Sequence, residues 1–181
     1  MGLDREQVVD AAVDVLVEQG RFPGLADVAG RLGIRTQSLY AHVDGVDGLR
    51  RQLALRGLAA LTHRLTDAAM GRAGADAVEA IVLAWVTFAA EQPGFYAASL
   101  RPPGDDPELN AAIAAATRPL NLVFRSYGLD DATAAHWYRL IFATVHGLSV
   151  LRADGLLTVL GDPDDTVRHA IAVFTRQLAS T

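Results

Sequence analysis

Apolar residues recur at helical spacing along nearly the whole of this 181-residue chain. After Asp162, for example, Val167, Ile171, Phe174 and Leu178 are spaced three or four residues apart, which places them on one face of a helix. Residues typical of helix starts precede such stripes, and no stretch alternates polar and apolar residues as a strand would. The pattern predicts an all-α protein of about nine helices.

Glycines, prolines and capping residues divide this pattern into separate helices. The expected helices begin near positions 4, 25, 36, 46, 76, 95, 106, 130 and 162. The seventh starts with Asp106, Pro107 and Glu108, which suit an N-cap, a first helical position and the positive end of the helix dipole. Pro119 lies farther along the same helix, where its missing N–H is expected to kink the helix or to end one segment.

The residue types exclude most catalytic and metal-binding chemistry. The chain has no cysteine, which excludes a disulfide scaffold, a Cys-ligated metal site and a thiol nucleophile. His136 and His146 are ten residues apart, so they point in different directions on a helix, and no other cluster has metal-site spacing. The sequence also lacks a nucleophile elbow and a glycine-rich phosphate loop. We therefore expect no metal, no cofactor and no enzymatic activity.

The hydrophobic segments are too short for a membrane protein. The longest uncharged apolar stretch covers residues 80–90, whereas a helix needs about 18–20 residues to cross a bilayer. Met1 leads into an acidic amphipathic segment instead of the basic and apolar regions of a signal peptide. The sequence therefore predicts a cytoplasmic protein without a membrane partner.

The charge is distributed unevenly along the chain. The net charge is −5, but residues 21–56 contain six arginines and only three acidic residues, which gives this stretch a charge of +3. From residue 57 onward, nine arginines face thirteen acidic residues, and the charge is −4. Because phosphate contacts require cationic side chains, the basic stretch is compatible with a nucleic-acid partner despite the acidic total.

Two short predicted helices lie within this basic stretch. They cover residues 25–32 and 36–43, and Gly33 suits the left-handed residue that follows the first of them. Two short helices joined by a tight glycine-containing turn form a helix-turn-helix unit, whose second helix enters the major groove of DNA.

Residues 4–56 resemble the DNA-binding domain of TetR-family transcriptional repressors. The resemblance is carried by Ala-Gly-Arg-Leu-Gly-Ile at 29–34, by Ser-Leu-Tyr-Ala-His-Val at 38–43 and by Leu49. It implies a homodimer that binds a palindromic double-stranded DNA operator and releases it when a small molecule occupies the C-terminal domain. It also implies two domains, residues 1–56 for DNA binding and residues 57–181 for ligand binding and dimerisation.

The resemblance assigns a role in DNA binding to the residues of the second short helix. Thr36 and Gln37 would contact base edges, since an amide can pair bidentately with adenine. Ser38, Tyr40 and His42 match positions that mostly hold phosphates, and Arg35 suits either role. The alternatives are that Tyr40 packs in the core and that His42 caps the helix.

Three positions depart from the family pattern. Gly24 stands at the usual Ser or Thr cap, Ala26 stands where a side chain often reaches DNA, and Val46 stands where the family has a phosphate-binding lysine. We therefore expect weaker DNA binding than is typical of the family, and each lost phosphate contact also flattens the salt dependence of that binding.

Residues 57–181 resemble the family's ligand-binding half more loosely. Residues 142–148 are similar to the Trp-His-Gly motif of one class of these domains, with Val145 in place of tryptophan. As a set, the aromatic residues predict a mostly apolar pocket with a few polar groups, although for any single one of them core packing is the better explanation. The candidate ligand-binding residues are Trp85, Phe88, Phe95, Tyr96, Arg118, Phe124, Trp137, Arg139, Phe142 and His146.

The last two predicted helices are the expected dimer interface. The family normally packs these helices against their symmetry mates as a four-helix bundle, and the alternative is that they only close the chain's own core. The candidate interface residues are Ala135, Ala143, Ile171, Phe174 and Leu178.

The sequence thus predicts a ligand-responsive repressor that a small lipophilic or aromatic effector releases from DNA. The alternative is an all-α ligand-binding protein or enzyme whose N-terminal helices do not bind DNA.

Overall fold

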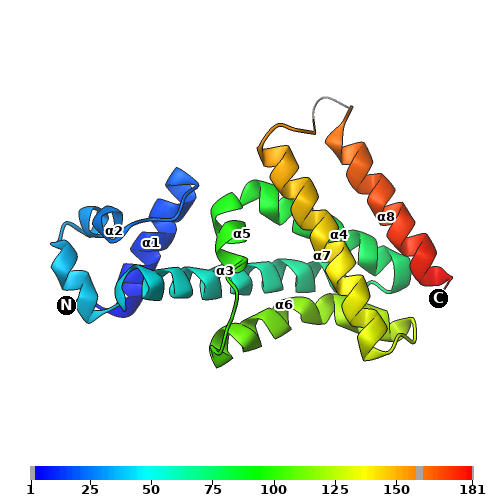
Figure 1. Cartoon of the computed structure of the whole chain (residues 1–181), viewed down its shortest axis with the longest axis horizontal. Helices are drawn as coiled ribbons and strands as arrows, with labels where there is room; N and C mark the ends of the chain where they lie inside the picture. The colour runs from blue at the N-terminus through cyan, green and yellow to red at the C-terminus, as the bar shows by residue number, and fades with distance from the viewer. Residues whose placement is uncertain (1–2, 158–160, 181) are drawn as a thin grey trace. The chain divides into compact units, whose positions relative to one another are not determined.

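The computed structural model describes residues 3–157 and 161–180, and in these residues every regular element is helical (Figure 1). The all-α prediction is confirmed. Eight α-helices and one 3₁₀ helix lie in this part of the chain. In order they are α1 (Arg5–Gln19), α2 (Leu25–Leu32), η1 (Thr36–Ala41), α3 (Gly45–Ala69), α4 (Gly74–Glu91), α5 (Pro93–Ser99), α6 (Pro107–Ser126), α7 (Asp131–Ala153) and α8 (Pro163–Ala179).

The predicted capping residues begin their helices as expected. Asp4 accepts a hydrogen bond from the Gln7 amide at 2.8 Å, while the Gln7 side chain accepts one from the Asp4 amide at 3.0 Å, which completes a capping box. Asp130 and Asp162 accept backbone N–H bonds at the starts of α7 and α8. These side chains satisfy donors that a helix start leaves without a partner.

Pro119 does not end α6, which runs without a break from Pro107 to Ser126. Leu120, Val123 and Phe124 follow it in the same helix and are buried. Packing of this apolar face offsets the missing proline hydrogen bond, so of the two outcomes expected at Pro119, a kink or a segment end, the segment end does not occur.

The second helix of the helix-turn-helix unit is a 3₁₀ helix. The expected segment was residues 36–43, whereas η1 covers Thr36–Ala41 and its ends make i to i+3 hydrogen bonds, from Ser38 N to Arg35 O and from His42 N to Leu39 O, both at 2.9 Å. The segment is short and Arg35 gives it no side-chain cap, which favours the tighter helix. Gly33, in the turn between α2 and η1, has a φ of 67°, which is the left-handed conformation that the sequence predicted.

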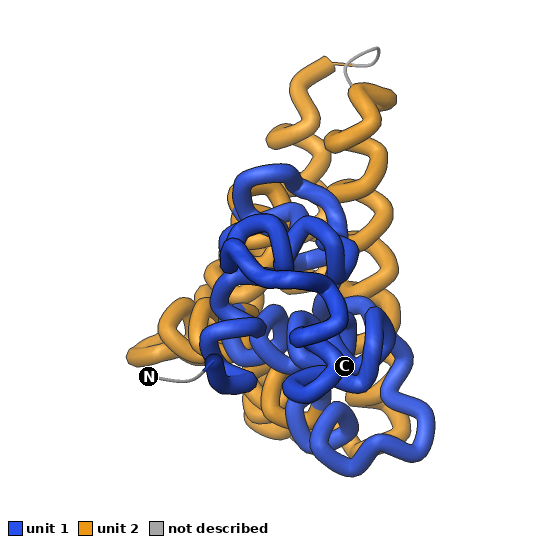
Figure 2. Tube along the Cα trace, turned by 90° about the vertical axis from the view of Figure 1, so that its left-hand side faces the viewer, with its two compact units in different colours: residues 1–60, 92–113 blue, residues 61–91, 114–181 orange. Residues whose placement is uncertain are grey.

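The chain forms two compact units (Figure 2). The first unit comprises residues 1–60 and 92–113, and the second comprises residues 61–91 and 114–181. The functional division into residues 1–56 and 57–181 stays a prediction.

The core of the first unit joins α1, α2, η1, the start of α3 and α5. Leu16, Val28, Leu39, Leu49 and Leu53 are fully buried in this cluster. Because the two short helices contribute Val28 and Leu39, the turn between them is held by packing on both sides.

The core of the second unit is built on α4, which packs against α7 and α8. Trp85, Phe88 and Phe124 are its largest fully buried side chains, together with aliphatic residues such as Ile81 and Ile141. None of the described helices is long and apolar enough to span a membrane.

Candidate nucleic-acid interface and effector site

The segment η1 has one buried residue and an exposed polar side. Leu39 is completely buried in the first unit's core, whereas Arg35, Gln37 and Ser38 are exposed and Tyr40 retains 62% of its accessible surface. The alternative that Tyr40 packs in the core is therefore not realised in this structure. Leu39 anchors the segment, and the candidate DNA contacts surround that anchor on the solvent side.

Thr36 and His42 are half-buried at the two ends of this segment. His42 follows the last residue of η1, and its amide donates to Leu39 O, so its backbone terminates the helix. The Nε of Arg5 donates to the His42 carbonyl at 3.1 Å. Arg5 is thus a further exposed cation beside the candidate interface. Because it lies in an acidic N-terminal segment, the sequence gave no indication of this position.

Most arginines in the basic stretch already pair with carboxylates. Arg21 contacts Asp27 at 3.0 Å, and Arg31 contacts Glu18 at 2.7 Å. Arg56 contacts Asp10 at 3.1 Å. The hydrogen bond from Arg21 lowers the pKa of Asp27 below its ordinary value. Since several of these acids lie outside residues 21–56, the count of +3 overstates the charge available to phosphates.

Two arginines of the stretch have no such ion pair among the residues that the structure describes. Arg35 stands at the entrance of η1, and Arg50 lies over the Phe22 ring, 5.6 Å from its centroid. Their positive charges therefore remain available for phosphate groups.

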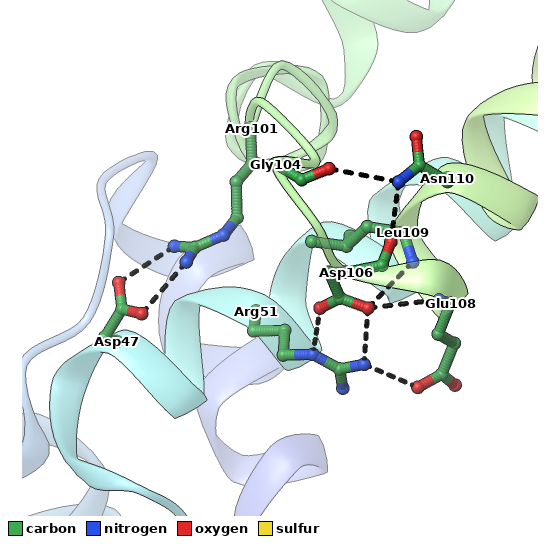
Figure 3. Close-up of polar contacts among 8 residues, drawn as sticks. All are labelled: Asp47, Arg51, Arg101, Gly104, Asp106, Glu108, Leu109 and Asn110. Atoms are coloured by element: carbon green, nitrogen blue, oxygen red, sulfur yellow. Dashed lines mark hydrogen bonds and ion pairs between the residues drawn. The ribbon is translucent and has the colours of Figure 1, made fainter.

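Two ion-pair groups connect α3 with the segment between α5 and α6 (Figure 3). Arg101 donates two hydrogen bonds to Asp47, at 3.0 and 2.9 Å, which lowers the pKa of that carboxyl. Arg51 contacts both Asp106 and Glu108, and its hydrogen bonds lower the pKa of Asp106 to about 2. The same contacts raise the pKa of Arg51. Sequence reasoning missed these pairs.

Four rings of α4 and α7 form an aromatic column in the second unit. Trp85 lies 6.0 Å from Tyr138 and 5.7 Å from Phe142, and Phe142 lies 6.0 Å from His146. Burial raises the pKa of Tyr138 to about 12. The structure thus brings three of the candidate ligand-binding residues together. The indole N–H of Trp85 is buried and has no hydrogen-bond partner in the described part of the chain.

The remaining aromatic candidates lie elsewhere. Phe88 and Phe124 are fully buried in the second unit, and Trp137 meets Phe174 edge to face at 6.4 Å. Phe95 and Tyr96 belong to α5 in the first unit, so the structure does not gather the whole predicted set in one unit. Core packing accounts for the fully buried members of this set.

The two cationic candidates are both exposed, but only one lines a groove. Arg139 lies on α7, with its Nη2 3.2 Å from His136 Nδ1. Arg118 lines a groove of about 530 Å³ in the second unit. The groove lies between residues of α3 and α6, and its other lining residues are Thr62, Thr66, Ala69, Arg72, Ala73, Ala115, Pro119, Leu122, Val123 and Ser126. Sequence reasoning identified none of these ten.

The candidate dimer residues differ in exposure. Ile171, Phe174 and Leu178 on α8 are buried within the chain's own core. Ala135 is half-buried, and Ala143 is exposed. The same two helices also expose large apolar side chains, namely Leu140, Val150, Leu151 and Val173.

A family model matches the second half of the chain. The model describes a "Tetracyclin repressor-like, C-terminal domain" and covers residues 78–174, which is more than half of the 181 residues. The chain belongs to the TetR family. The resemblance read from the helix-turn-helix motif is confirmed by this independent match to the other half of the TetR-family chain.

Two bacterial relatives support the same identification. An uncharacterized HTH-type transcriptional regulator of Mycobacterium tuberculosis, Rv0681, is 35% identical over 86% of this chain and 72% of the relative. Another uncharacterized HTH-type transcriptional regulator, YobS of Bacillus subtilis, is 30% identical over 84% of this chain and 81% of its own length. This TetR-family protein is therefore a transcriptional regulator, and both relatives are named as regulators and not as enzymes.

Solved structures support the fold. A bacterial regulatory protein of the tetR family from Rhodococcus RHA1 superposes with a TM-score of 0.71 and covers 98% of both chains. At 14% identity, this likeness concerns the fold alone. In the TetR-family chain described here, no group of three or more metal-ligating side chains occurs in the described residues.

Proposed function

We propose that the protein is a ligand-responsive repressor that binds a palindromic operator as a homodimer. The observation that carries this proposal is the arrangement of η1, in which Leu39 is buried while Gln37, Ser38 and Tyr40 are exposed. An anchored short helix with polar side chains on its free side suits insertion into the major groove.

The candidate side chains fall into those that contact bases and those that contact phosphates. Thr36 and Gln37 contact base edges, where the amide of Gln37 can pair with adenine. Ser38, Tyr40 and His42 bind phosphates and fix the position of the segment on the duplex. The guanidinium of Arg35, which has no carboxylate partner among the described residues, adds a further phosphate contact.

The homodimer follows from the geometry of the operator. Two recognition segments must reach half-sites about 34–36 Å apart, one helical turn of DNA. The large apolar side chains that α7 and α8 expose, Leu140 and Val173 among them, suit the contact between two copies. Ala135 and Ala143 are small and allow these helices to approach closely.

The effector in this proposal is a small lipophilic or aromatic molecule bound by the second unit. The column brings the rings of Trp85, Phe142 and His146 together, and the groove beside Arg118 combines apolar side chains with threonine, serine and arginine side chains. Such surroundings with a few polar groups are the usual make-up of a small-molecule site.

A gel-shift experiment tests the proposal. The purified chain is titrated onto the DNA upstream of its own gene at about 50 and about 200 mM salt, where phosphate contacts give strong salt dependence. Tyr40→Ala should weaken binding, whereas Val17→Ala, at a position with a similar exposed fraction of 63%, should not. If a folded dimer fails to bind at the lower salt concentration, the proposal is wrong and a ligand-binding protein without DNA binding is favoured.

A further inference from the structure

The groove beside Arg118 has the size and apolar walls of a small-molecule site. Its volume of about 530 Å³ lies within the range of about 300–1,000 Å³ that is usual for ligand pockets. Pro119, Leu122 and Val123 of α6 line one wall, and Ala69 of α3 lies on the other. Leu122 retains 55% of its accessible surface, whereas Pro119 and Val123 are largely buried, so Leu122 is the apolar side chain of this wall that the chain itself leaves uncovered.

Two arginines and no carboxylate line this groove. Arg118 comes from α6, and Arg72 comes from the connection between α3 and α4. The Nη1 of Arg72 donates to the carbonyl of Ala68 at 2.8 Å, which holds the side chain at the end of α3. Because a guanidinium carries five N–H donors, this contact leaves others for a ligand.

Among the described residues, most other arginines of the second unit pair with a carboxylate, whereas Arg139 and Arg176 do not and lie outside the groove. Arg64, Arg125, Arg152 and Arg168 each form an ion pair with an aspartate or glutamate. Among the residues that the structure describes, no ion pair neutralises Arg72 or Arg118. The two charges therefore add to one positive region at the groove, in a domain that is acidic as a whole.

We propose that this groove is the effector site and that its ligand is an amphipathic organic anion. The acidic head group of the ligand pairs with Arg72 and Arg118, while its hydrocarbon part lies on Pro119, Leu122 and Val123. Guanidinium groups bind carboxylates and phosphates through charge-assisted hydrogen bonds, and the apolar wall binds the rest of the molecule. The role of the anion as an effector rests on the proposed function, whereas binding of the anion to the groove does not.

The aromatic column is a weaker candidate for the effector site than the groove. Its rings lie on one another's faces, with Phe142 between Trp85 and His146, so the chain's own side chains already occupy the contacts that an aromatic ligand would make. The groove has open volume and free charge together.

Calorimetric titration of the full chain tests the binding step. The probes are decanoate, decyl phosphate and 1-decanol, each kept below the concentration at which it forms micelles. Decanoate or decyl phosphate should bind, and the uncharged alcohol should bind at least about tenfold more weakly because it cannot form the charge-assisted contacts. The two anions distinguish a carboxylate ligand from a phosphate ligand.

Variants locate the site. Arg118→Gln and Arg72→Gln should each weaken binding of the anion by at least about tenfold. Arg125→Gln, an exposed position on the same helix that does not line the groove, should leave it unchanged. Leu122→Glu should also weaken binding, through the loss of apolar contact and the added negative charge. All four positions are exposed, and circular dichroism checks that the variants fold.

Three results would overturn the proposal. The first is that neither anion binds, the second is that 1-decanol binds as tightly as the anions, and the third is that Arg118→Gln binds the anion like the unchanged chain.

A gel shift then tests the effector role: the anion that binds should release DNA from the unchanged chain but not from Arg118→Gln. Full retention of DNA at saturating anion refutes that role. DNA binding without ligand is measured separately, so failure of the proposed function is distinguishable from failure of this site.

Discussion

Arg51 and Asp106 are 55 residues apart in the sequence, yet the guanidinium holds the carboxylate through two hydrogen bonds, one of them at 3.0 Å (Figure 3). The same carboxylate accepts the amide hydrogens of Glu108 and Leu109, at 3.0 and 3.2 Å, and so caps α6. A single aspartate therefore both begins a helix and ties that helix start to α3.

Replacing Asp106 with asparagine should separate these two roles. Asparagine is an equally good N-cap but carries no charge, so Asp106→Asn should lower the free energy of unfolding at neutral pH through the ion pair alone. Asp106→Ala should cost about 1 kcal/mol more because it also removes the cap. Urea unfolding followed by circular dichroism measures both differences.

The effect of Asp106→Asn should depend on pH. The pKa of Asp106 is lowered in the folded chain from 3.8 to about 2, so its charge stabilises the fold above pH 3.8 and this contribution is lost as the pH falls toward 2. The gap in stability between the unchanged chain and Asp106→Asn should therefore shrink over that interval. The neighbouring variant Asp105→Asn is the control, and an Asp106→Asn gap that stays constant down to pH 2 contradicts the prediction.

Gly57→Ala should destabilise the first unit. A Cβ at Gly57 would lie 2.6 Å from the carbonyl oxygen of Phe95, and that atom belongs to the backbone and cannot rotate away. Overpacking of this kind costs about 1–3 kcal/mol. Gly30→Ala is the control, because its Cβ would meet no atom within 4 Å and alanine should gain up to about 1 kcal/mol as a helix former. Thermal unfolding of the two variants should therefore shift in opposite directions.

The sequence predicted the helices well because their signals are local. Asp130 and Asp162 cap α7 and α8, and both helices begin where the sequence suggested. The type of η1 was not predicted, because a six-residue segment has too few hydrogen bonds for its own residues to decide between an α-helix and a 3₁₀ helix. The fold of this part depends on the burial of Leu39.

The candidate sites were predicted less completely because they depend on residues far apart in the chain. The arginine count over residues 21–56 could not include Asp106, which neutralises part of it. The groove was represented only by Arg118, since its other lining residues are mostly small or hydroxylated and carry no distinctive pattern. Conversely, the aromatic residues were prominent in the sequence, but several of them, such as Phe124, are simply buried.

Arg35→Ala should reduce the salt dependence of DNA binding. If Arg35 contacts a phosphate, its removal should lower the slope of the logarithm of affinity against the logarithm of salt concentration by about 0.9. Fluorescence anisotropy with a labelled operator fragment at several salt concentrations gives this slope. Arg125→Gln serves as a control outside residues 1–56 and should leave the slope unchanged. A slope that stays the same in Arg35→Ala would mean that this arginine does not neutralise a phosphate.

Leu140→Glu and Val173→Glu should each convert the proposed dimer into monomers. Leu140 on α7 and Val173 on α8 retain 52% and 43% of their accessible surface, so glutamate at either position leaves the chain's own core intact. In an apolar contact between two copies, however, the added carboxylate would be buried without a partner, which should raise the dissociation constant by more than about tenfold.

Light scattering after size-exclusion chromatography measures the mass of each variant at several concentrations. Leu83→Glu on α4 is the matched control, because Leu83 is also exposed, at 40%, but lies outside the proposed interface. The control should remain a dimer while the α7 and α8 variants dissociate. If all three behave alike, the apolar residues of α7 and α8 do not form the contact, and a different face must bring the two recognition segments together.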